Sequence, residues 1–140
     1  MAKEKWSPSR KEIEGILDIE NKREIFLVGH VIIERMLEKI LEEKFDIPLQ
    51  VSDEAIFMWS QKMLILEKSG KVQGRLLSNL RAINRIRRGY AHYLNPDEGV
   101  IQDRIKSLGY LGHVPKHGLG GLEKYRACVI ATFDELVKLL

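Results

Sequence analysis

The stretch from residue 76 to residue 94, LLSNLRAINRIRRGYAHYL, constrains the fold of this chain more than any other. Its apolar residues recur at steps of three and four, the spacing that puts side chains on one face of an α-helix. These residues are Leu76, Leu80, Ile83, Tyr90, Ala91 and Leu94. Arg87 falls in the middle of the stripe, where an unpaired charge is costly unless it meets a partner or an anion. The stretch therefore predicts an amphipathic helix with Arg87 as its first functional candidate.

The opposite side of the same helix is basic. At about 100° per residue, Arg81, Arg85, Arg88 and His92 gather there. Residues 75–88 include five arginines and no acidic residue, so this side would attract an anionic partner such as nucleic acid. The whole chain has 23 lysines and arginines against 20 acidic residues, a net charge of +3. The clustering of positive charge on one side of this helix therefore matters more than the small net charge of the chain.

Helical spacing continues through the rest of the chain. We expect a short helix that starts at Ser7–Pro8 and a long central helix from an Asn21 cap to about residue 45. A third helix is expected from Ser52 to a stop near Gly70, and a fifth after the break at residues 95–98. A last helix covers residues 122–140. Residues 1–6 are expected to be a frayed leader, and the glycine-rich residues 109–121 a loop.

The expected helices should bury most of their apolar residues in one core. The central helix carries two adjoining apolar stripes, so it should be buried over more than half its circumference. His30 lies within one stripe and is expected to be a hydrogen-bonded core or interface histidine. The third helix carries an aromatic and methionine cluster that we also assign to the core. Its members are Phe57, Met58, Trp59, Met63, Leu64 and Leu66. Lys62 is expected to be solvated or to reach towards a phosphate.

No segment shows the alternating pattern of a strand, and no internal repeat is present. The 140 residues suffice for one domain with its own core. Helices joined by short connections indicate an all-α fold, a mostly antiparallel bundle of five to six helices, over residues 1–140. His113 and His117 are four residues apart, but Pro115 and the nearby glycines exclude a helical metal site. We expect no metal and no cofactor.

The sequence also bears on the compartment. Cys128 is the single cysteine, so an intrachain disulfide is impossible and a reducing, cytoplasmic setting is expected. No apolar run approaches the roughly 20 residues that a membrane span needs. The first fifteen residues lack the apolar region of a signal peptide.

Arg87, followed by Arg88-Gly89-Tyr90-Ala91 and then His92, resembles the R-x4-H signature of the HEPN superfamily, which includes metal-independent endoribonucleases. Three pieces resemble the small mannitol-repressor-type proteins of that superfamily: GHVIIERMLEKIL at 29–41, SQKMLILEKSGKV at 60–72 and INRIRRGYAH at 83–92. The resemblance implies a HEPN-like helical domain that acts as a homodimer on RNA. It also implies a possible toxin or defence role, with an antitoxin or regulatory partner.

RNA carries its own nucleophile, the 2′-hydroxyl, so cleavage needs only a base, an acid and positive charge at the phosphate. His92 would act as base or acid, and Arg87 would bind the phosphate. Arg81, Arg85 and Arg88 would hold the RNA, and Tyr90 and Tyr93 would stack its bases. The list of candidate site residues is therefore Arg87 and His92 for catalysis and Arg81, Arg85, Arg88, Tyr90 and Tyr93 for RNA binding.

Five residues on an ideal helix separate Arg87 and His92 by about 140°. They converge only if the helix distorts near Gly89, if Arg87 reaches around, or if a second subunit supplies the partner residue. Three alternatives stay open. Arg87 could pair with a carboxylate such as Glu34; the chain could be a non-catalytic regulator or adaptor; or it could bind nucleic acid without cleaving it. Arg88 favours the second, because the family usually has a short polar residue there and a second guanidinium disfavours a protonated His92.

Overall fold

Six α-helices form the part of the chain that the computed structural model describes, which is residues 8–45, 59–92, 97–109 and 121–140. Residues 90–92 are described by their backbone alone. The helices are α1 (Arg10–Ile16), α2 (Lys22–Phe45), α3 (Trp59–Ser69), α4 (Gly74–His92), α5 (Glu98–Lys106) and α6 (Gly121–Val137). These residues include no strand, and the predicted all-α helical bundle is confirmed.

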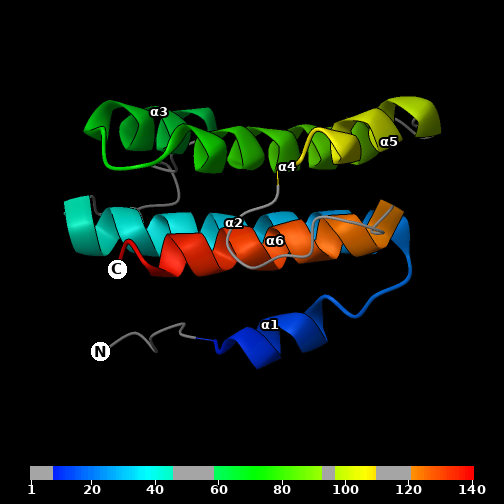
Figure 1. Cartoon of the computed structure of the whole chain (residues 1–140), viewed down its shortest axis with the longest axis horizontal. Coiled ribbons are helices and arrows are strands. Elements are labelled where there is room, and N and C mark those ends of the chain that lie inside the picture. The colour runs from blue at the N-terminus through cyan, green and yellow to red at the C-terminus, as the bar shows by residue number, and fades with distance from the viewer. Residues whose placement is uncertain (1–7, 46–58, 93–96, 110–120) are drawn as a thin grey trace.

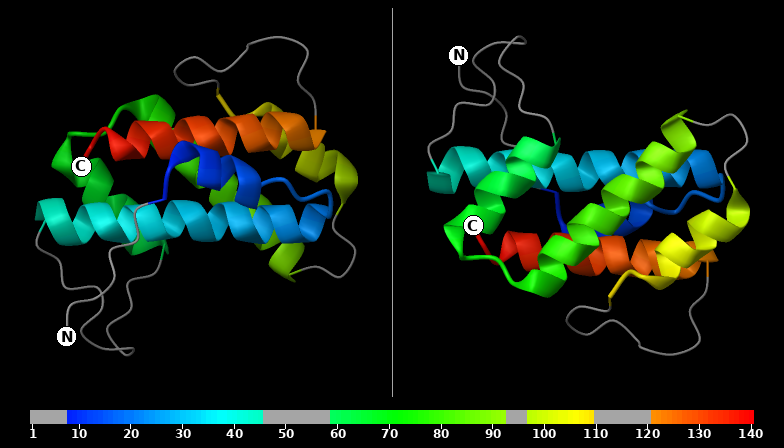
Figure 2. Two further views of the ribbon diagram at one scale, coloured as in Figure 1. Left: turned by 90° about the horizontal axis from the view of Figure 1, so that it is seen from below. Right: turned by 90° about the horizontal axis from the view of Figure 1, so that it is seen from above.

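The helices are arranged in three layers (Figure 1). Helices α3, α4 and α5 form one outer layer, α2 and α6 the middle layer, and α1 the other outer layer. Figure 2 shows that α2 and α6 lie side by side and run in the same direction, whereas α4 crosses them obliquely. This parallel pair departs from the mostly antiparallel arrangement that we expected. It is possible because α4 runs in the opposite direction and carries the chain back before α6 begins (Figure 2).

Helix α2 is the centre of the core, and its most extensive contacts are with α6 and α4. Both of its predicted apolar stripes face inward, which confirms their assignment. Tyr125 of α6 is buried against it, edge-on to Phe26 with ring centroids 4.7 Å apart, and its hydroxyl donates to the Phe26 carbonyl at 3.4 Å. A Cβ atom at Gly29 would lie 2.5 Å from the Tyr125 hydroxyl oxygen. The glycine therefore permits the close approach of α2 and α6.

The helix starts partly differ from those that the sequence predicted. Helix α1 is capped by Ser9 and not started by Ser7–Pro8, because Glu12 completes a capping box with Ser9. Asn21 does cap α2, and its side chain accepts from the Glu24 amide at 3.0 Å. Helix α5 is capped by Asp97, whose side chain accepts from two amides of its first turn. A carboxylate is favoured there because it also meets the positive end of the helix dipole.

The third helix ends where it was expected to end, with Gly70 at a φ of +69°. Leu64, assigned to the core, is instead about half exposed, while Trp59, Met63 and Leu66 are buried as expected. Gly121, the last residue of the glycine-rich loop predicted over 109–121, is instead the first residue of α6. Several predictions fall on residues outside the described ranges. These are the leader over residues 1–6, the Ser52 helix start, Phe57, Met58, Leu94, the helix break at 95–96, and residues 110–120 with His113 and His117.

Two buried contacts fix α4 against its neighbours. The Asn79 side chain both donates to and accepts from the backbone of Gly109, each at 2.8 Å, so it anchors the chain that follows α5. A Cβ atom at Gly89 would lie 2.9 Å from Cδ1 of Ile101, so this glycine lets α5 pack closely on α4. The outer face of α4, which lies next to α3, stays exposed.

Candidate nucleic-acid interface

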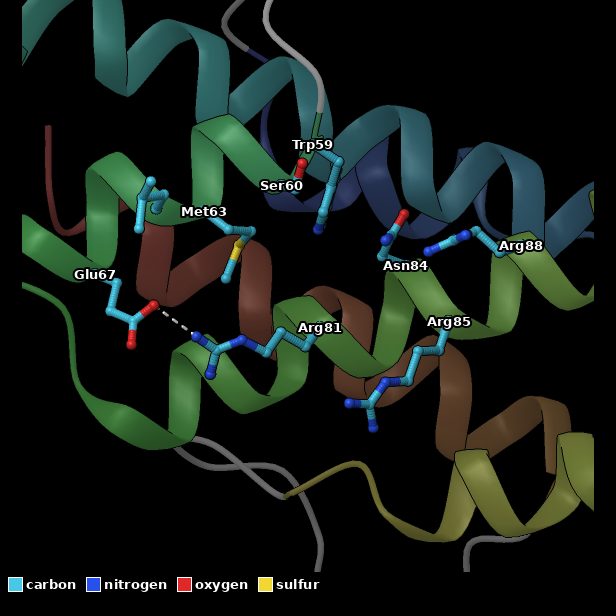
Figure 3. Close-up of a pocket in the computed structure, with 9 residues that line it drawn as sticks. Trp59, Ser60, Met63, Glu67, Arg81, Asn84, Arg85 and Arg88 are labelled. Carbon is cyan, nitrogen blue, oxygen red and sulfur yellow. Dashed lines mark hydrogen bonds and ion pairs between the residues drawn. The ribbon is translucent and has the colours of Figure 1, made fainter.

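The outer face of α4 is basic, as the sequence predicted. Arg81, Arg85 and Arg88 are all exposed, and their side chains extend over the same side of the helix (Figure 3). Arg81 forms an ion pair with Glu67 of α3, with Nη2 and Oε2 2.8 Å apart. Within the described residues, neither Arg85 nor Arg88 forms an ion pair. The face therefore presents two guanidinium groups that no described carboxylate neutralises.

A pocket of about 250 Å³ opens beside these arginines, between α3 and α4. Helix α3 contributes apolar side chains, one serine and one glutamate, and α4 contributes three arginines and one asparagine. The lining residues are Trp59, Ser60, Met63, Leu64 and Glu67 from α3 and Arg81, Asn84, Arg85 and Arg88 from α4.

Trp59 stands at the inner end of this pocket. Its side chain is only 9% exposed, and its ring stacks on His30 with centroids 4.3 Å apart and a tilt of 30°. The indole Nε1 is buried and has no hydrogen-bond partner among the described residues. Figure 3 shows this nitrogen pointing into the space between α3 and α4. A buried N–H group without an acceptor is costly, so a partner is expected to approach from the pocket.

Asn84 links the pocket to the core. Its Oδ1 atom lies 3.1 Å from Nε2 of His30, and because an amide oxygen can only accept, that ring nitrogen carries the proton. Because its oxygen faces His30, the amide nitrogen is the donor that Asn84 offers to the pocket it lines. The prediction that His30 is a hydrogen-bonded core histidine is confirmed, since the residue is 4% exposed.

Burial lowers the pKa of His30 below its usual 6.5. Glu34 and the hydrogen bond that His30 donates to Asn84 oppose this shift, while the charges of Arg87 and Lys62 add to it. His30 is therefore neutral at pH 7, and its single N–H keeps Asn84 in one orientation.

The prediction that Lys62 is solvated or reaches towards a phosphate is wrong. The side chain is buried, with Nζ 2.9 Å from Oε1 of Glu38 and 3.2 Å from Oε2 of Glu34. These two carboxylates stand one turn apart on α2, so the lysine ties α3 to α2 and holds the Trp59 side of the pocket in place. The signal was visible in the sequence, because Lys62 lies on the same helical stripe as Trp59 and Leu66.

Arg87 lies apart from the basic face and is half-buried on the side of α4 near His30, whose pKa its charge lowers. The alternative pairing with Glu34 is not among the ion pairs of the described residues, in which Glu34 binds Lys62. Helix α4 is α-helical from Gly74 to His92, so it is not interrupted at Gly89. Within one chain, the backbone positions of Arg87 and His92 therefore lie about 140° apart around the helix axis.

The remaining candidates fall outside what the structure describes. The backbone of Tyr90 and His92 belongs to the last turn of α4, but their side chains lie outside the described residues, as does Tyr93 entirely. Their roles in stacking and catalysis stay predictions.

The fold and the site together define an all-α protein with a basic pocket between two helices, α3 and α4, and with Trp59 at the inner end of that pocket. None of its helices, over the described ranges, is long and apolar enough to cross a membrane. The same ranges hold no group of three or more His, Cys, Asp or Glu side chains placed to bind a metal ion. Comparisons of the chain with protein-family models, curated proteins and solved structures find no match.

Proposed function

We propose that this protein is a HEPN-like, metal-independent endoribonuclease that binds RNA across the outer face of α4 and acts as a homodimer. The observation that carries the proposal is the pair Arg85 and Arg88, two exposed guanidinium groups without a described carboxylate partner beside a pocket with a buried, unpartnered indole N–H. Guanidinium groups bind phosphate oxygens in bidentate geometry, and the affinity of such a face grows as salt is lowered.

Cleavage is assigned to Arg87 and His92. One imidazole takes the proton of the 2′-hydroxyl, the 2′-oxygen attacks phosphorus, and the 5′-oxygen leaves with a proton from an acid. The products are a 2′,3′-cyclic phosphate and a 5′-hydroxyl. Because α4 is uninterrupted at Gly89, we assign the pairing of arginine and imidazole to two subunits related by a two-fold axis. Tyr90 and Tyr93 are assigned to base stacking near the cleaved bond.

Incubation of the purified protein with a single-stranded RNA in EDTA tests the proposal. Wild-type protein is expected to cleave the RNA, and the Arg87→Ala and His92→Ala proteins to lose at least about 100-fold in rate, the usual contribution of a positioned acid or base. Arg75→Ala is the matched control, because Arg75 is an exposed arginine in the first turn of α4 that does not line the pocket. End-group analysis should find cyclic phosphates, and sedimentation should give a dimer. Intact RNA with micromolar wild-type protein would rule out the activity.

The second candidate function is a non-catalytic regulator or adaptor. The neighbouring Arg88 favours it, since a guanidinium four residues before His92 disfavours the imidazolium that an acid must form. In that case RNA stays intact, and capture of a protein partner such as an antitoxin is the same with wild type and His92→Ala. Either function is proposed for the cytoplasm, where the single cysteine stays reduced.

A further inference from the structure

We infer that the pocket between α3 and α4 binds a single keto base, uracil or guanine, of an RNA strand whose phosphates lie on Arg85 and Arg88. This inference deepens the proposed function and rests on it for the identity of the polymer. The pocket itself is defined by groups that take no part in cleavage: Trp59, Asn84 and the side chains around them.

The size of the pocket suits one base. Its volume of about 250 Å³ falls below the roughly 300 to 1,000 Å³ of sites that enclose drug-sized ligands. Met63 and Leu64 provide apolar surface on the α3 side, and arginine planes on the α4 side can stack on a base. His30 covers one face of the Trp59 ring, and the side chain as a whole is only 9% exposed. Its Nε1 points into the space between α3 and α4 (Figure 3), so the indole meets the ligand through its N–H edge.

The polarity of the pocket selects the class of base. The indole Nε1 and the guanidinium groups can only donate, and Asn84 has committed its oxygen to His30, which leaves its two N–H donors. Glu67, the one acidic side chain in the lining, is held by Arg81. The Ser60 hydroxyl, the remaining polar side chain of the lining, can donate or accept, so the pocket offers an excess of donors and favours a ligand that presents acceptors. Guanine offers O6 and N7 and uracil offers carbonyl oxygens, whereas adenine and cytosine turn an amino group to the same edge.

The donors are held in place before any ligand arrives. The His30 ring packs on Trp59 and its Nε2–H fixes the Asn84 oxygen, so both donors of the pocket are oriented by one buried residue. Lys62, bound to Glu34 and Glu38, fixes α3 on α2 beneath them. Pre-oriented polar groups reject ligands that leave them unpaired more strongly than mobile ones do.

Titration of the protein with UMP, GMP, AMP, CMP and inorganic phosphate tests the inference. The chain has two tryptophans, so Trp6→Phe leaves Trp59 as the only indole reporter of fluorescence. UMP or GMP is expected to bind at least about ten-fold tighter than AMP and CMP, the discrimination of one good base contact. Calorimetry with the unsubstituted protein gives a second readout that does not depend on the reporter.

Two variants isolate the donors. Trp59→Phe keeps an aromatic ring on His30 but removes the N–H, and Asn84→Asp keeps an oxygen for His30 but replaces the pocket donor by an acceptor. Each should abolish the preference for keto bases while the helical circular dichroism stays that of wild type. Arg75→Ala, a charge removed from the same helix outside the pocket, should leave the preference unchanged.

Equal affinity for all four nucleotides, or phosphate binding as tight as UMP binding, would overturn the inference and leave only an anion site. Nucleotide preference without RNA cleavage would support the pocket and refute the endoribonuclease. Cleavage with no nucleotide preference would refute the pocket and leave the endoribonuclease standing. The two proposals therefore fail in distinguishable ways.

Discussion

Replacement of Lys62 by methionine should destabilise the fold by about 2–4 kcal/mol. The ammonium group lies 2.9 Å and 3.2 Å from two carboxylates, and its side chain is 3% exposed. At an effective dielectric constant of 20, each pair at about 3 Å attracts by about 5 kcal/mol before desolvation is subtracted. Loss of one partner of a buried ion pair typically costs about 3–5 kcal/mol. The expected cost is lower, because the Glu34 and Glu38 side chains are 31% exposed and water relieves part of their repulsion.

Urea unfolding followed by far-ultraviolet circular dichroism measures this cost. Glu34→Gln alone should cost only about 1 kcal/mol, because Lys62 keeps Glu38. The triple variant Lys62→Met/Glu34→Gln/Glu38→Gln should recover most of the loss, because it removes the charges together instead of leaving two carboxylates unpaired. A loss below 1 kcal/mol in Lys62→Met, or a triple variant no more stable than Lys62→Met, would refute the view that this ion cluster joins α3 to α2.

Three further predictions concern stability. Because burial lowers the pKa of His30, the unfolded chain binds a proton near pH 6.5 that the folded chain does not. The free energy of unfolding should therefore fall as the pH drops below 6.5, by at most about 1.4 kcal/mol per pH unit from this group. This fall should be smaller in His30→Gln. Asn79→Ala loses both bonds that its side chain makes to the chain after α5 and should cost about 2–3 kcal/mol in urea unfolding; a cost below about 0.5 kcal/mol would contradict the role given to this side chain. Gly29→Ala should lower the thermal midpoint of unfolding because the added Cβ meets the buried Tyr125. Gly15→Ala, whose added Cβ has no neighbouring atom within 4 Å, should leave the midpoint unchanged or raise it. Equal shifts in the two variants would contradict the close approach of α2 and α6.

The sequence was a good guide to the faces of single helices. The apolar stripes of α2 and α4 and the basic side with Arg81, Arg85 and Arg88 follow from a period of 3.6 residues, which depends on no other part of the chain. The Ser9 cap was missed because the start was assigned to Ser7–Pro8, although Ser9 lies three residues before a glutamate, the spacing of a capping box.

The pocket was not predicted, because it exists only where two helices meet. Trp59 alone reads as a core residue and Asn84 as part of a helix; their donor groups share one space only after α3 has docked on α2 and α4. The position of Lys62 on the buried stripe of α3 was visible in the sequence, but its ion pairs depend on the same docking, since their carboxylates stand on α2, a different helix. The parallel course of α2 and α6 likewise depends on the path that the intervening helices take (Figure 2).

The pairing of α2 with α6 also bears on how the protein is made. During synthesis, α2 leaves the ribosome long before α6, and the apolar surface that α6 covers stays exposed until the chain up to Val137 has emerged. Long-range pairing of this kind slows folding and exposes nascent chains to aggregation. The nascent chain is therefore expected to need chaperone protection of α2 until α6 is complete.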